Sequence, residues 1–108
     1  MNKFEVVLLF SPDLSNSIIS NEAEKFTKNI EDIDGKIISL EDWGLRDLSY
    51  NIKNYKKAFY KFYQIELESQ KIVSTKTSLN QNENILRHLF VKVKEHQTLP
   101  TKMNNEEK

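Results

Sequence analysis

The order in which hydrophobic periodicity changes along the chain constrains its fold more than any other feature. Residues Lys3–Phe10 form a short apolar run typical of a buried strand. Pro12 ends this strand because proline has no backbone N–H to donate to a sheet. A helical stripe follows, with Ser15 as its expected N-cap and Gly35 as the expected left-handed residue at its C-terminus. The apolar residues of the stripe are Ile19, Ala23, Phe26, Ile30 and Ile33.

The middle of the chain is predicted to form two strands joined by a turn. Residues Lys36–Lys53 form a long predicted strand, in which Gly44 indicates a bulge or a bend. Residues Asn54–Lys57 are the predicted turn. Residues Ala58–Leu67 alternate and are rich in aromatic side chains, which favours a second strand.

A short helix and a last strand complete the predicted elements. Ser69 is the expected N-cap of the helix. The apolar stripe of this helix is thin and consists of Ile72, Val73 and Leu79. Residues Asn80–Asn84 form a predicted loop, and residues Leu86–Val93 the last strand.

The order strand, helix, strand, strand, helix, strand predicts an α+β ferredoxin-like sandwich. Right-handed crossovers put both helices on one face of a four-stranded antiparallel sheet, with the strands that start at Lys3 and Ala58 in the centre. The predicted domain comprises residues 1–94. Residues 95–108 are polar and lack periodicity, so we expect a flexible C-terminal tail.

The face of the sheet opposite the helices is expected to be open. Alternation along the two central strands puts four apolar side chains on it. An apolar patch of this kind is typical of a protein-binding surface. The candidate partner-binding residues are therefore Val7, Leu9, Tyr60 and Phe62.

The chemistry of an enzyme or a metal site is missing from the sequence. The chain has no cysteine and only two histidines, His88 and His96, and neither of its two glycines belongs to a phosphate-binding loop. Its longest apolar run has five residues, whereas a membrane helix needs about 18. We therefore expect no catalysis, no metal, no cofactor, no small-molecule substrate and no membrane partner.

The charges sum to zero but are unevenly distributed. Residues 1–47 carry a net charge of −5, residues 48–94 of +6 and residues 95–108 of −1. Lys53, Lys56 and Lys57 lie around the predicted turn, among aromatic residues that include Tyr50. Lysines of this kind contact phosphate backbones, and aromatic rings stack on unpaired bases. A solvated turn would give the same local composition, so the cluster alone leaves both interpretations open.

Two longer stretches resemble the bacterial ribosomal protein S6 family. The first runs from Trp43 to Lys53 and continues with Lys57–Tyr60, and the second comprises residues 82–92. The similarity extends over about residues 1–94. It implies a structural protein of the small ribosomal subunit in the cytoplasm, which binds small-subunit (16S) ribosomal RNA together with ribosomal protein S18.

The resemblance also marks candidate RNA-binding residues. Arg46, Tyr50, Lys53 and Arg87 match family motif positions, while Asn51 stands where the family usually has proline. Together with the remaining cations of the turn and the strands, the candidate set is Lys3, Arg46, Tyr50, Lys53, Lys56, Lys57, Arg87 and Lys92.

Two other functions fit the same topology. A small-molecule regulatory (sensor) module is the main alternative, although such modules often bind near glycine-rich turns and this chain has none. A stand-alone RNA-recognition domain is disfavoured because Lys61 stands where its third-strand motif has an aromatic residue.

Overall fold

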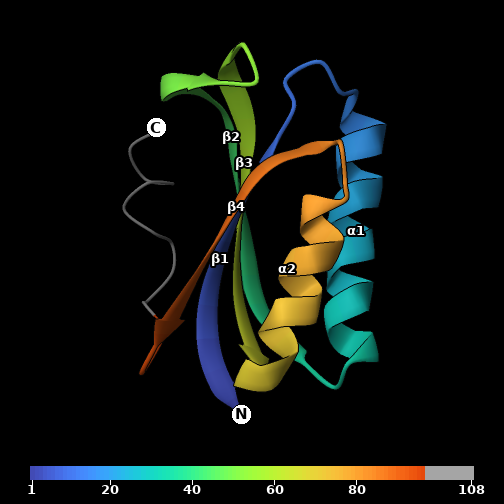
Figure 1. The fold of residues 1–108 in the computed structure, drawn as a ribbon, viewed down its shortest axis with the longest axis vertical. Helices are drawn as coiled ribbons and strands as arrows, with labels where there is room; N and C mark the ends of the chain where they lie inside the picture. The colour runs from blue at the N-terminus through green and yellow to red at the C-terminus, as the bar shows by residue number, and fades with distance from the viewer. Residues whose placement is uncertain (97–108) are drawn as a thin grey trace.

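The computed structural model describes residues 1–96, and the rest of the predicted tail, residues 97–108, lies outside the described residues. The secondary-structure elements, in chain order, are β1 Asn2–Phe10, α1 Asn16–Asp32, β2 Lys36–Ile52, β3 Tyr55–Leu67, a 3₁₀ turn Ser69–Lys71, α2 Ile72–Asn80 and β4 Ile85–Val93. The sheet has the order β2-β3-β1-β4 with antiparallel neighbours, and both helices cover one of its faces (Figure 1). The predicted ferredoxin-like fold is confirmed. No helix within the described part is long and apolar enough to cross a membrane.

The core lies between the sheet and the helices. Alternate residues of β1 and β3 point into it, as predicted, and the ring of Phe26 on α1 lies 4.8 Å from that of Tyr63 on β3. The fully buried side chains of this core include Val6, Leu8, Phe10, Ile30, Tyr63, Ile65 and Leu67.

The N-terminus of α1 is capped as the sequence predicts. The Oγ atom of Ser15 accepts a hydrogen bond of 3.3 Å from the backbone N–H of Ile18. This bond satisfies one of the free donors in the first turn of the helix.

A left-handed residue ends α1 as predicted, but the prediction that this residue is Gly35 is wrong. Asp34, not Gly35, adopts the left-handed conformation, with φ of 66°. The N–H of Gly35 donates to the carbonyl of Ile30 at 2.9 Å, and the N–H of Asp34 donates to that of Glu31 at 3.1 Å. This pair of bonds is the Schellman pattern that ends many helices.

Gly35 is required for close packing instead. A Cβ atom at this position would lie 2.6 Å from Cγ2 of Ile30 and 2.9 Å from Cδ1 of Leu67. The missing side chain thus lets the end of α1 approach the end of β3.

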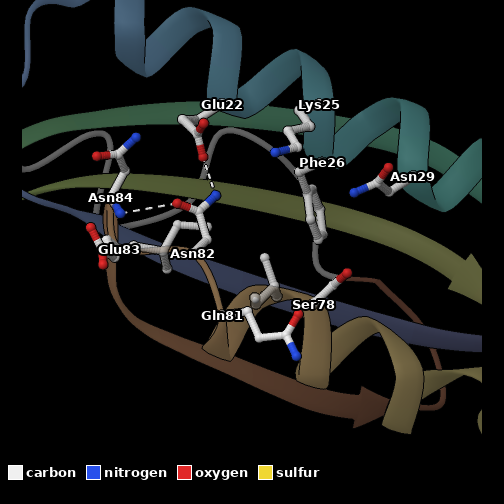
Figure 2. Close-up of a pocket in the computed structure, with 11 residues that line it drawn as sticks. Glu22, Lys25, Phe26, Asn29, Ser78, Gln81, Asn82, Glu83 and Asn84 are labelled. Atoms are coloured by element: carbon white, nitrogen blue, oxygen red, sulfur yellow. Dashed lines mark hydrogen bonds between the residues drawn. The ribbon is translucent and has the colours of Figure 1, made fainter.

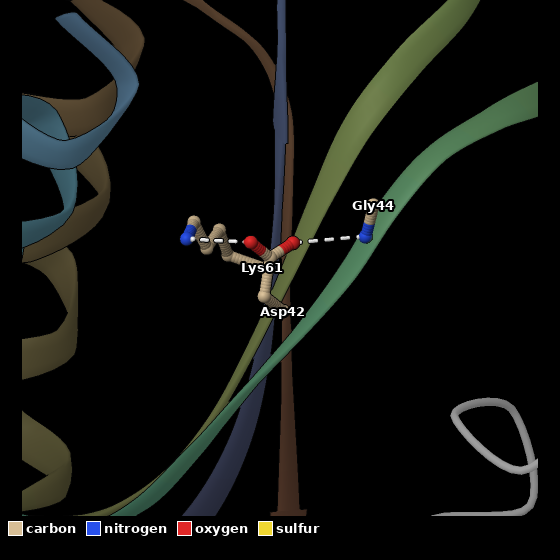
Figure 3. A network of polar contacts seen from close by, with 3 residues as sticks. All are labelled: Asp42, Gly44 and Lys61. Atoms are coloured by element: carbon tan, nitrogen blue, oxygen red, sulfur yellow. Dashed lines mark hydrogen bonds and ion pairs between the residues drawn. The ribbon is translucent and has the colours of Figure 1, made fainter. Parts of the chain in front are cut away.

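The predicted bulge at Gly44 is confirmed. Gly44 has φ of 75°, and the register passes from Asp42 to Gly44 so that Trp43 is the extra residue. Asp42 supports the bulge from both sides: it accepts a bond of 2.9 Å from the N–H of Gly44 and one of 3.2 Å from Nζ of Lys61 (Figure 3).

The turn between β2 and β3 is shorter and earlier than predicted. It consists of Lys53 and Asn54 between the paired residues Ile52 and Tyr55, and not of residues 54–57. Both turn residues have positive φ, 50° and 71°. This is the type I′ geometry, which matches the twist of two antiparallel strands and which asparagine tolerates well.

Ser69 is not an N-cap, contrary to the prediction. Its hydroxyl donates to Oδ1 of Asn2 at 2.7 Å, and its backbone N–H donates to the same oxygen at 3.2 Å. Because Asn2 at the start of β1 already binds this segment, a 3₁₀ turn precedes α2, which begins at Ile72 without a side-chain cap.

Candidate nucleic-acid and protein interface

The β2–β3 hairpin extends past the rest of the sheet. The pairing of β1 with β3 stops at Phe10 and Phe59, while β2 and β3 stay paired to Ile52 and Tyr55. The end of the hairpin is drawn in green at the top of Figure 1. Two-stranded projections of this kind offer side chains to a partner without moving the core.

Three of the candidate RNA-binding lysines lie at the end of this hairpin. Lys53 is in the turn, and Lys56 and Lys57 follow at the start of β3; all three are exposed. Nζ of Lys57 is 3.7 Å from Oδ1 of Asp47, in a solvent-exposed pair that contributes little energy. We call Lys53, Lys56 and Lys57 the hairpin lysines.

A hollow of about 270 Å³ opens beside the base of the hairpin on the sheet face opposite the helices. Arg87 of β4 donates from Nη1 to the hydroxyl of Tyr50 on β2, so two motif residues that are 37 positions apart meet here. The residues that line this open-face hollow are Val7, Leu9, Trp43, Leu48, Ser49, Tyr50, Ile52, Tyr60, Arg87 and Leu89.

The predicted apolar patch is only partly exposed, and the prediction is wrong for two of its four residues. Phe62 and Leu9 are 3% and 5% exposed. The ring of Trp43 stacks on Phe62 with centroids 5.0 Å apart and an interplanar angle of 10°, and Nε1 of Trp43 donates to Glu41 at 2.9 Å. Trp43 therefore covers Phe62 from the face that the sequence analysis left open.

Leu9 is buried for a different reason, and the other two residues reach the surface. Leu9 packs in a second small cluster with Ala58 and Leu86. Val7 and Tyr60 are half-buried in the wall of the open-face hollow.

Of the other candidate cations, Arg46 lies on the hairpin strand β2, where its partner is Ala58, and Lys3 and Lys92 lie apart from the hairpin. Arg46 donates from Nε to the carbonyl of Trp43 at 3.1 Å, so it holds the bulge in place. Lys3 is paired with Glu66 at the opposite end of the sheet. Lys92, the partner of the core residue Phe4, belongs to the face that carries the helices. The β2–β3 hairpin thus carries the hairpin lysines, Arg46 and Tyr50, with Arg87 bonded to Tyr50, while Lys3 and Lys92 lie at the other end of the sheet.

Sequence analysis missed the apolar side chains that β4 adds to the open face. Leu89 is 45% exposed and Val91 56%. The register pairs them with Val7 and Glu5, which face away from the helices. Alternation along residues 86–93 could have predicted this, because in a strand Leu89 and Val91 point to one face and His88 and Phe90 to the other.

The small-molecule alternative would need a pocket built for a ligand. A polar hollow of about 520 Å³ lies between α1 and the loop before β4 (Figure 2). In it Asn82 donates to Glu22 and accepts a bond of 2.9 Å from the N–H of Asn84, so this side chain holds the loop. Among residues 1–96 no group of three or more side chains could hold a metal ion.

Within residues 1–96, the acidity of Tyr63 and of His88 is perturbed, and neither side chain lines the open-face hollow. Burial raises the pKa of the Tyr63 hydroxyl, helped by the negative charge of Asp42. Burial, and then the positive charge of Lys76, lowers the pKa of His88 from its usual 6.5. Neither shift indicates a catalytic pair, because each has a structural cause.

Comparison with known proteins identifies relatives along nearly the whole chain. The family model described as ribosomal protein S6 matches residues 3–92. The chain is 28% identical over 96 residues to the small ribosomal subunit protein bS6 of Flavobacterium johnsoniae, covering 89% of this chain and 85% of that protein. The crystal structure of 30S ribosomal protein S6 from Thermotoga maritima has the same fold, with a TM-score of 0.81 at 22% identity, over 85% of this chain and 87% of that one.

Proposed function

Because the chain belongs to the ribosomal protein S6 family, we propose that it binds 16S ribosomal RNA together with ribosomal protein S18. Family membership makes it a protein of the small ribosomal subunit in the cytoplasm, and the family is one of structural ribosomal proteins. The observation that supports the finer proposal is that the β2–β3 hairpin, whose end carries the hairpin lysines, also lines the open-face hollow with Tyr50 and Ile52.

The two parts of this surface suit two kinds of partner. The hairpin lysines are exposed cations on a projecting element, which is the arrangement that contacts RNA phosphates. The open-face hollow is mostly apolar and ends in the exposed side chains Leu89 and Val91, which suit a protein surface. Tyr50 and Arg87, which are bonded to each other, line the hollow.

The small number of cations implies that RNA binding by this protein alone is weak. Each neutralised phosphate adds roughly 0.7–0.9 to the salt slope, and a few such contacts give nonspecific affinities of about 10⁻⁴ to 10⁻⁶ M. Tight binding then requires the second protein to bring further contacts. We expect no catalytic activity, cofactor or small-molecule substrate.

The test is a titration of a central-domain fragment of 16S RNA with this protein, with S18, and with both. The pair is expected to bind far more tightly than either protein alone. Equal affinity of this protein with and without S18 would refute the cooperative scheme.

A matched pair of variants tests the surface. Leu89→Asp puts a charge beside the open-face hollow, whereas Val73→Asp puts one on α2, where Val73 is 72% exposed. We expect Leu89→Asp to weaken the protein pair first and RNA binding as a consequence, and Val73→Asp to leave both unchanged. Phe62 is unsuitable for this test because a charge there would disrupt its buried stack with Trp43.

A further inference from the structure

The sequence of α2 has little intrinsic tendency to form a helix. The helix has nine residues, whereas an isolated helix needs roughly 12–15. Four of the nine are β-branched, the first turn has no side-chain cap or acidic residue, and the last turn has no basic residue. The hydroxyl groups of Ser74, Thr75 and Thr77 donate to backbone carbonyls of the preceding turn, which weakens a helix further. Contacts with the rest of the fold must therefore hold α2 in place.

The chain is fixed independently on both sides of α2. Before the helix, the hydroxyl of Ser69 donates to Asn2 at the start of β1. After it, the side chain of Asn82 donates to Glu22 of α1. Residues 72–81 lie between these two attachments, so they can leave their place without moving the segments on either side.

The side of α2 that faces α1 is not closely packed. A hollow of about 240 Å³ lies between the two helices, with Phe26 of α1 and Ser78 of α2 in its wall. Both residues also line the polar hollow before β4 (Figure 2). The buried residues of α2 are Ile72, Thr75 and Leu79. Because α1 supports α2 only loosely, the contacts with β4 on the other side matter more.

The outer side of α2 contacts the edge strand β4 through Lys76 and Asn80. Nζ of Lys76 lies 5.7 Å from the centre of the Phe90 ring. At the C-terminal end of the helix, Nε2 of His88 donates to Oδ1 of Asn80 at 2.9 Å. An amide oxygen only accepts, so the proton of the neutral imidazole is on Nε2 and Nδ1 carries none. Within the described part of the chain, Nδ1 is buried and has no hydrogen-bond partner.

These surroundings favour the neutral form of His88. A second proton would bind to Nδ1, where it finds no acceptor, and would put a positive charge near Lys76. Burial, and then the charge of Lys76, accordingly lowers the pKa of His88 from its usual 6.5. The register partner of His88 on β1 is the buried Leu8, and the nearby ring on its own strand is Phe90, so neither adds charge. Protonation is therefore easier when α2 has moved away and His88 is exposed.

We propose that residues 72–81 open as a local unit while the sheet and α1 stay folded, and that protonation of His88 promotes the opening by breaking its contact with Asn80. The opening exposes Ile72 and Leu79, which the closed helix buries in the core. It belongs to the protein by itself and does not depend on the proposed function.

Amide hydrogen exchange of the full-length protein, measured residue by residue with NMR, tests the local opening. At pH 7.5 the amides of residues 76–80 are expected to be at least about tenfold less protected than those of Phe26 and Ile30 in α1. Their protection should also respond less to low concentrations of urea, because a local opening exposes less surface than global unfolding. Equal protection of the two helices would overturn the proposal.

The dependence of exchange on pH tests the role of His88. In the open state His88 has its usual pKa of 6.5, so the protection of residues 76–80 should fall by up to about tenfold between pH 7.5 and 5.5, after correction for the intrinsic exchange rate. In His88→Gln this fall should disappear. Protection that is independent of pH in the wild type, or that falls equally in His88→Gln, would overturn the role of His88.

Asn80→Ala separates the contact with His88 from the stability of the helix itself. Alanine favours a helix more than asparagine does, so a helix limited by its own propensity would become better protected. We expect lower protection of α2 instead, because the variant removes the acceptor for His88. Ser78→Ala is the matched control: it raises helix propensity at an exposed site without removing this acceptor, and should raise protection. A rise in both variants would overturn the role of the Asn80–His88 contact.

Discussion

The hydroxyl of Tyr63 lies in the core without a hydrogen-bond partner in the described part of the chain. A buried hydroxyl left unpaired costs roughly 1–3 kcal/mol of desolvation. The ring is retained for its packing against Phe26. Tyr63 is thus a residue whose apolar part stabilises the fold while its polar atom opposes it.

Tyr63→Phe is therefore expected to stabilise the protein by about 1 kcal/mol. The variant keeps the ring and removes only the desolvated hydroxyl. Urea unfolding measures the difference, with Tyr60→Phe as a control at a half-buried site. A loss of stability in Tyr63→Phe would show that a water molecule satisfies the hydroxyl.

His88 is predicted to make stability depend on pH. Its pKa is lowered in the folded state, so the unfolded chain binds the proton more readily and stability falls as the pH drops below about 6.5. The groups that surround it are Lys76 and Asn80 of α2 and the neighbouring ring of Phe90.

Urea midpoints at pH 7.5 and 5.5 measure this effect. His88→Gln should reduce the difference between the two midpoints. An identical pH dependence in wild type and His88→Gln would contradict the assignment.

At the scale of elements, two adjacent residues at the end of α1 meet two different structural requirements. Asp34 takes the left-handed conformation, and Gly35 allows the close approach to Leu67. An L-residue in the left-handed region costs roughly 1–2 kcal/mol, so the order of these two residues leaves strain in the turn. The Asp34 carboxylate recovers little of it, since its ion pair with Lys71, at 3.7 Å, is largely exposed.

Opposite results are expected from the two substitutions at this turn. Asp34→Gly should stabilise the protein by about 0.5–1 kcal/mol because it relieves the positive φ. Gly35→Ala should destabilise it by roughly 1–3 kcal/mol because the new Cβ meets Ile30 and Leu67. Thermal unfolding of both variants gives the comparison, and a stabilising Gly35→Ala would show that the end of α1 can move away.

At the scale of the whole molecule, charge is separated along the chain although its total is zero. The basic half contributes the hairpin lysines and Arg87, which the fold gathers at one end of the sheet. Such a distribution favours one oriented anionic partner over nonspecific coating of the surface.

Lys56→Gln/Lys57→Gln is expected to lower the salt slope of RNA binding by roughly 1.4–1.8, that is, by two phosphate contacts. Both residues are exposed, so the fold should be unaffected. The control is Lys25→Gln/Lys28→Gln, which removes the same charge from α1. Equal changes in the two double variants would mean that the hairpin has no special role.

The sequence by itself determined the element order, the fold class and the core face of each central strand. These depend on local periodicity, because a side chain's face in a strand or helix follows from its position in the repeat. The cap at Ser15 and the bulge at Gly44 were predictable for the same reason, since each follows from the chemistry of one residue and its neighbours.

Only the tertiary structure decided which surfaces are exposed and which distant residues meet. The stacking of Trp43 on Phe62, the bond between Tyr50 and Arg87, and the use of Asn2 to bind Ser69 all join separate strands or segments. The stacking of Trp43 on Phe62 also depends on the bulge that makes Trp43 an extra residue. Periodicity assigns a residue to one face of its strand or helix. Whether that residue is buried depends on side chains from other elements, and their positions follow from the packing of the whole chain.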